Sequence, residues 1–149
     1  MDREELNNIL QQHCQWLAGD SDSRANLSRA DLSEAIGLQN PIDWLEQHFE
    51  FSADGLIAYK IFGLHYSMPD TWKIEPRSII EEVCNPLPTN DCASGVNVAT
   101  LDWIKSNSNK DRVWRCLIRW PWLAGVVVPY NTDGKIRAAR VELLEEIKL

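Results

Sequence analysis

The spacing of apolar residues changes at Gly55, and this change limits the possible folds more than any other feature of the sequence. Before Gly55, apolar residues recur every three to four positions over residues 3–18 and from Pro41 to about Phe51, which predicts two helices. After it, short apolar or alternating runs bounded by Gly, Pro and Asn predict strands. The sequence therefore predicts an α+β protein: two N-terminal helices with a short linker, then a mixed or antiparallel sheet with one further helix.

The expected elements have recognisable ends. Asn40 and Pro41 are a favoured cap and first residue for the second helix, and Thr100 is a favoured cap for a helix from Leu101 to about Ser106. A turn at Asn131–Gly134 predicts a hairpin. We expect strands at Leu56–Phe62, Ile79–Val83, Gly95–Ala99, Val113–Trp120, Val126–Tyr130 and Lys135–Leu144. The predicted boundary separates a helical segment, 1–55, from an α+β domain, 56–149.

Charge is unevenly distributed along the chain. Residues 1–55 carry 11 acidic and 3 basic side chains, a net charge of −8, whereas residues 56–149 carry 11 acidic and 12 basic ones, a net charge of +1. The acidic segment indicates either a solvated surface or a face that repels nucleic acid and docks on a basic partner.

Two observations bear on the compartment. No run of roughly 18 apolar residues occurs, and the acidic start has no apolar leader, so we expect no membrane segment and no secretory signal. The four cysteines match no CxxC or zinc spacing, which favours free thiols in the cytoplasm and predicts no metal site.

Two pentads, 25–29 and 30–34, lie between the predicted helices, and a third, 35–39, has Gly37 at its centre. With the preceding helix, "HCQWLAGDSDSRANLSRADLSEA" resembles the start of pentapeptide-repeat proteins, in which the chain coils into a four-sided β-helix. Leu27 and Leu32 match the central position of the motif. Stacked repeats need about three units to share a core, so two intact pentads predict a linker and not a solenoid.

From about Leu56 onward the chain resembles an uncharacterised domain found beside pentapeptide repeats in bacteriophage and prophage proteins. The shared segments are "IAYKIFG", "KIEPRSIIEEV", "NDCASGVNVAT" and "VVVPYNTDGKIRAARVELLEE". The resemblance implies a phage-type accessory protein in the host cytoplasm that binds a host or phage protein, for example as a counter-defence inhibitor. It implies no catalytic chemistry and no cofactor, and it leaves the oligomeric state open.

An enzyme is the first alternative. The strand and helix expected within residues 90–103 follow a strand that contains Tyr and Lys. In strand order and residue pattern they resemble ADP-ribosyltransferases, and this resemblance would make NAD the cofactor. The candidate catalytic residues are Tyr59, Lys60, Ser94 and Glu142. The Arg or His usual on the first strand of that family is absent. Cys92 is a weaker candidate nucleophile, because no His stands in a recognisable motif with it.

Nucleic-acid binding is the second alternative. In a strand over Val113–Trp120, Arg115 and Arg119 share one face, and Trp114 and Trp120 share the other and are expected in the core. The candidate basic face, which would hold a phosphate, an RNA strand or an acidic protein, consists of Arg115, Arg119, Lys135 and Arg137. The competing interpretation is a surface salt-bridged to glutamates of adjacent strands. Because no convincing catalytic set is present, non-enzymatic protein binding is the preferred hypothesis.

Overall fold

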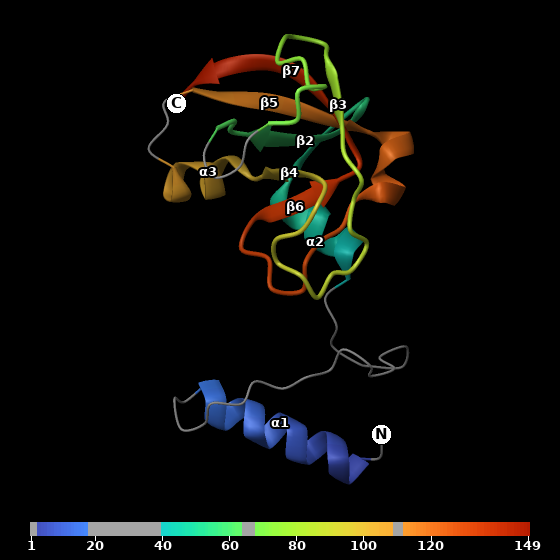
Figure 1. The fold of residues 1–149 in the computed structure, drawn as a ribbon, viewed down its shortest axis with the longest axis vertical. Helices are drawn as coiled ribbons and strands as arrows, with labels where there is room; N and C mark the ends of the chain where they lie inside the picture. Colours follow the sequence, from blue (N-terminus) through green and yellow to red (C-terminus); the bar gives the residue numbers. More distant parts are fainter. Residues whose placement is uncertain (1–2, 18–39, 64–67, 109–111) are drawn as a thin grey trace. The chain divides into compact units, whose positions relative to one another are not determined.

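The computed structural model describes residues 3–17, 40–63, 68–108 and 112–149 (Figure 1). The chain divides into two units, Met1–Gly37 and Leu38–Leu149, and each is described by itself. The pentads at 25–39 lie outside the described residues. The predicted boundary at 55/56 falls inside the second unit, because Leu45 and Phe49 belong to the core of that unit.

The described part of the first unit is one helix. Helix α1 (Arg3–Leu17) matches the helix expected over 3–18. Glu4 and Glu5 lie in its first turn, where the helix dipole favours negative charge. None of the described helices is both long enough and apolar enough to cross a membrane.

Helix α2 (Pro41–His48) begins as predicted and ends earlier. The Asn40 side-chain oxygen accepts a hydrogen bond from the Ile42 N–H at 2.9 Å, which satisfies one free amide of the first turn. The helix was expected to reach about Phe51, and this is corrected by strand β1 (Glu50–Ser52), which pairs with β2 (Gly55–Lys60). Strand pairing satisfies the backbone there and stacks Phe51 on Trp120.

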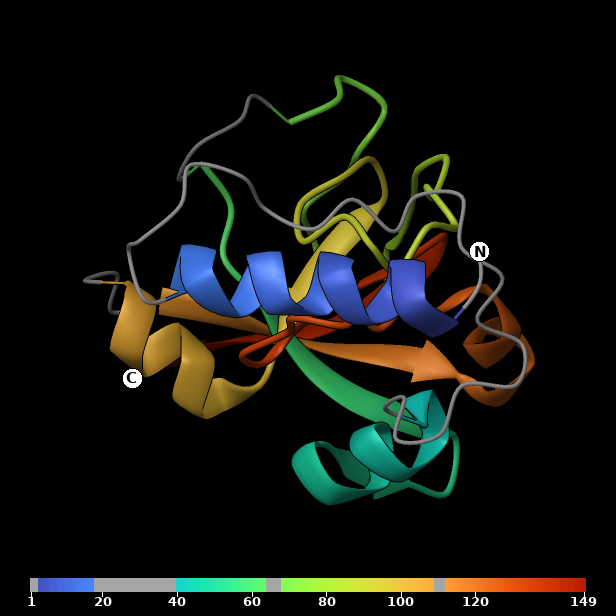
Figure 2. The same cartoon turned by 90° about the horizontal axis from the view of Figure 1, so that it is seen from below.

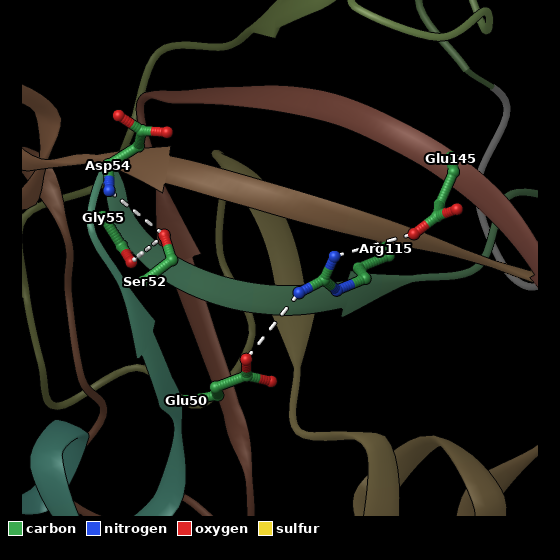
Figure 3. Close-up of polar contacts among 6 residues, drawn as sticks. All are labelled: Glu50, Ser52, Asp54, Gly55, Arg115 and Glu145. Carbon is green, nitrogen blue, oxygen red and sulfur yellow. Dashed lines mark hydrogen bonds and ion pairs between the residues drawn. The ribbon is translucent and has the colours of Figure 1, made fainter.

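A tight turn joins β1 to β2. The Ser52 hydroxyl donates to the Gly55 carbonyl at 3.0 Å and accepts from the Asp54 N–H at 3.3 Å (Figure 3). Gly55 has φ +152°, and a Cβ there would lie 2.1 Å from the carbonyl oxygen of Ile118. Only glycine fits this close approach of β2 to β5.

The second unit is built on one curled antiparallel sheet, which confirms the predicted α+β class. Its strand order is β3-β7-β5-β2-β4-β6, with β1 beside β2. The remaining strands are β3 (Ile79–Glu81), β4 (Val96–Ala99), β5 (Arg112–Arg119), β6 (Lys135–Ala138) and β7 (Arg140–Lys148). Figure 1 shows β7, β5, β2, β4 and β6 in succession from top to bottom.

The strand predicted over Lys135–Leu144 is in fact two strands that part at Ala139. β6 pairs with β4, whereas β7 pairs with β5 and β3. Because these partners lie in different parts of the sheet, one straight strand cannot pair with all of them, and the chain bends where the sheet curls. The strand predicted over Val126–Tyr130 is reduced to a single bridge between Val127 and Arg137.

Two apolar clusters lie on opposite faces of the sheet. The inner face carries the main core, which includes Leu45 of α2, Trp114, Cys116 and Ile118. Helix α3 (Leu101–Asn107) covers part of the outer face through Ile104. Its Thr100 cap accepts from the Trp103 N–H at 3.2 Å, as expected. α2 and α3 lie well apart in Figure 2.

Trp120 departs from its expected place in the core. It opens a 3-10 helix, η1 (Trp120–Gly125), and its side chain is 47% exposed. Pro121 follows Trp120 directly, and Arg119, the residue before Trp120, is the last residue of β5 to pair with β2. Because proline has no N–H to donate, the ladder ends here and the chain leaves the sheet.

Candidate functional site

Strand register sets out the candidate residues on the outer face in rows. Tyr59, Arg115 and Glu145 are direct partners across β2, β5 and β7. The adjacent row contains Leu117 and Glu142. The predicted alternation of β5 is confirmed for Arg115, which lies opposite the main-core residues of the same strand.

Arg115 lies between two glutamates (Figure 3). Its guanidinium is 3.7 Å from the Glu50 carboxylate on β1 and 3.6 Å from the Glu145 carboxylate on β7. Both glutamate side chains are largely exposed, at 64% and 59%. These are long, solvated ion pairs, which contribute little to stability.

Two further arginines of the outer face also meet glutamates. Arg119 donates through Nε to Glu142 at 2.7 Å, and Glu142 is buried. Arg140 pairs with Glu81 on β3. Arg115, Arg119 and Arg140 therefore form a salt-bridged surface with neighbouring strands, the competing interpretation considered for this face.

Arg137 has no exposed surface. Its guanidinium donates to the carbonyls of Asn85 at 2.9 Å and Asn90 at 2.7 Å, and also to that of Leu87. Arg137 therefore binds the main chain of the loop before β4 and does not extend a basic surface with Arg115 and Arg119.

Lys135, at the start of β6, faces a cysteine. Its Nζ lies 3.3 Å from the Cys92 sulfur and 5.3 Å from the centroid of the Trp103 ring. Beside the pair is a hollow of about 330 Å³ lined by Asp91, Pro129, Asn131, Thr132, Asp133 and Lys135. Cys92 thus has an amine beside it and not an imidazole.

The four candidate catalytic residues are not assembled. Tyr59 packs in the apolar cluster under α3, whereas Lys60, the next residue, points to the inner face. Glu142 lies on the outer face, where its carboxylate is paired with Arg119. Ser94 is exposed and precedes β4. β2 and β4 are hydrogen-bonded neighbours at Tyr59 and Ala99, so no pocket opens between them there.

Lys60 is nevertheless in an unusual environment. Its Nζ donates to the Asn97 carbonyl at 2.9 Å and lies 5.2 Å from the Phe62 ring and 5.3 Å from the Trp72 ring. Burial lowers the pKa of Lys60 to about 8, since the charged form loses its hydration. Burial likewise raises the pKa of the facing Cys116 thiol to about 12.

A shallow groove lies where β3, η1 and the start of β7 meet. It measures about 640 Å³ and is lined by Thr71, Glu81, Glu82, Val83, Pro121, Trp122, Gly125, Ala139 and Arg140. Arg119 and Arg140 both lie against the Trp122 ring, 6.0 and 5.4 Å from its centroid. We call it the Trp122 groove. Its walls come from β3, η1 and the bend at Ala139, three segments far apart in sequence.

The described residues contain no group of three or more His, Cys, Asp or Glu side chains that could hold a metal ion. No family model, no curated protein and no solved structure matches this chain.

Proposed function

We propose that this chain acts by binding another protein through the Trp122 groove, and not by catalysis. The supporting observation is an exposed aliphatic side chain at a shallow groove that a half-buried tryptophan also lines. Val83, on the wall of the groove, is 80% exposed, and Trp122 packs partly against the main core. Water-exposed apolar surface at a concave site is typical of interaction sites.

The segment that carries the groove residues Pro121 and Trp122 is anchored at its first residue, Trp120. Trp120 donates from its indole N–H to the Ala53 carbonyl at 2.7 Å and stacks on Phe51 with centroids 5.5 Å apart. These contacts fix the start of η1, so the groove wall formed by Pro121 and Trp122 needs little reordering on binding. Tryptophan and arginine are the side chains most enriched where binding energy is concentrated in protein interfaces.

Charge indicates the chemistry of the occupant. The groove is lined by two carboxylates, Glu81 and Glu82, and one guanidinium, Arg140. Arg140 is paired with Glu81, which leaves Glu82 without a cationic partner among the groove residues. The whole chain carries −7. These charges favour an extended segment of a partner protein that carries an apolar side chain next to Lys or Arg.

The resemblance to phage proteins would make the partner a host or phage protein and the chain a cytoplasmic accessory factor. The NAD-enzyme alternative has less support, because Lys60 and Glu142 point to opposite faces of the sheet. Nucleic-acid binding also has less support, since Arg115, Arg119 and Arg140 already face glutamates.

Selection from a random peptide library displayed on phage, panned on the full chain, tests the proposal. The matched variants are Val83→Arg in the groove and Ile42→Arg on α2, because both residues are exposed aliphatics. We expect enriched peptides with apolar–basic pairs whose binding weakens by about tenfold or more in Val83→Arg and is unchanged in Ile42→Arg. Absence of enrichment, or equal binding to both variants, would contradict the proposal.

A further inference from the structure

Cys92 and Lys135 bring a thiol and a primary amine into contact at the surface. The Lys135 Nζ donates to the Cys92 sulfur at 3.3 Å, across 43 residues of sequence. The Trp103 ring beside Lys135 restricts where the amine can lie. A nucleophilic sulfur and a nitrogen that can attack it are therefore already adjacent in the fold.

The surroundings of this pair admit a small reagent. Cys92 is exposed, and the hollow of about 330 Å³ beside it is lined by Lys135 and by Asp91, the residue before Cys92. Two other cysteines lack these conditions. Cys116 has no exposed surface, and Cys84 is half-buried, with its thiol pKa raised by burial.

We propose that Cys92 and Lys135 are an oxidation site that a hydroperoxide closes into a covalent sulfur–nitrogen bridge. The site does not overlap the Trp122 groove, and the proposal is independent of protein binding.

The chemistry balances in two steps. The Cys92 thiolate attacks one peroxide oxygen, the O–O bond breaks, and the products are a sulfenic acid and hydroxide. Sulfur loses the two electrons that the peroxide gains. The neutral Lys135 amine then attacks that sulfur, the S–N bond forms, the S–O bond breaks, and the departing hydroxide takes a proton from nitrogen and leaves as water.

The bridge would tie the loop before β4 to the first residue of β6. Cross-linking positions this far apart in the chain restricts the unfolded state, so oxidation should raise the melting temperature. Arginine at position 135 keeps the positive charge but lacks a nucleophilic amine. Lys135→Arg therefore separates bridge formation from simple electrostatic activation of the sulfur.

Peroxide treatment followed by mass spectrometry tests the proposal. The experiment uses the full chain with Cys14→Ser and Cys84→Ser, so that neither residue forms a disulfide with Cys92. This protein is treated with hydrogen peroxide at pH 9, because a larger fraction of lysine side chains is neutral there. We expect a loss of about 2 Da, joined peptides containing Cys92 and Lys135, reversal by dithiothreitol and a higher melting temperature. In Lys135→Arg we expect no joined peptide and greater labelling of Cys92 by dimedone, which traps sulfenic acids.

Two results would overturn the proposal. One is dimedone labelling of Cys92 that is the same with and without Lys135→Arg, and no joined peptide in either protein. The other is a loss of about 2 Da that occurs only when Cys84 is restored and persists in Lys135→Arg, which would identify a disulfide. A thermal melt of each variant before oxidation shows whether it is folded.

Discussion

Cationic side chains differ in burial and in hydrogen-bonding partners between the two halves of the sheet. In the half formed by β2, β4 and β6, Lys60 and Arg137 are buried and donate to main-chain carbonyls. In the half formed by β3, β5 and β7, Arg115 and Arg140 are partly exposed and face glutamates. The first arrangement ties loops and strands together, whereas the second makes a solvated, nearly neutral surface. The buried contacts should therefore contribute more to the free energy of unfolding than the exposed ion pairs.

Arg137→Ala should have the largest effect on stability. Its removal leaves three carbonyls of the loop before β4 without their donor, and we expect a loss of roughly 3 to 5 kcal/mol in the free energy of unfolding. Urea unfolding measures this loss. Arg140→Ala is the matched control, because Arg140 is partly exposed and contacts the exposed Glu81 carboxylate and the Trp122 ring, neither of which is a main-chain carbonyl. Equal losses in the two variants would remove the contrast between the halves.

This difference was not visible in the sequence, although much of the fold was. Asn40, Thr100 and the alternation of β5 predicted two caps and one strand, since these signals depend on nearby residues. Arg137 occupies a strand position much like that of Arg115. Its burial depends on the loop at 85–90 folding over it, a contact between residues about 50 positions apart.

Lys60 provides the second test, through pH. Its pKa is about 8 in the folded chain against 10.5 as the ordinary value, so the unfolded chain binds more protons between these values. Burying the charged Lys60 amine lowers the free energy of unfolding by its full amount below pH 8. This loss is recovered as pH rises toward 10.5. From about pH 7 to 9, Lys60 should therefore add roughly 1 kcal/mol of stability.

The control for this effect is Lys60→Met, which keeps the length of the side chain and removes the titration. The gain between about pH 7 and 9 should be smaller in the variant than in the parent chain by that amount, as measured by urea unfolding at each pH. Cys116 faces Lys60 and titrates above this window in the folded chain. A parallel pH dependence in both proteins would show that Lys60 is not buried as a cation.

The candidate site was less predictable than the fold for a related reason. The sequence singled out Arg115 and Arg119 correctly as sharing a face, but it could not show which glutamates face them, since Glu50 and Glu145 come from strands at opposite ends of the unit's sequence. No local pattern in the sequence places Trp122 beside Val83. The groove exists only because the chain bends at Ala139 and brings β3 near η1.

Arg115 should give the smallest effect, and it tests the exposed half directly. A double-mutant cycle with Arg115→Ala and Glu145→Ala isolates their interaction. Because the atoms are 3.6 Å apart and the glutamate is 59% exposed, we expect a coupling below about 0.5 kcal/mol that falls as salt is added. Glu50 can also pair with Arg115 when Glu145 is removed, since its carboxylate lies 3.7 Å from the same guanidinium. A coupling of about 2 kcal/mol or more that is insensitive to salt would mean that the exposed ion pair stabilises the fold as strongly as the buried contacts do.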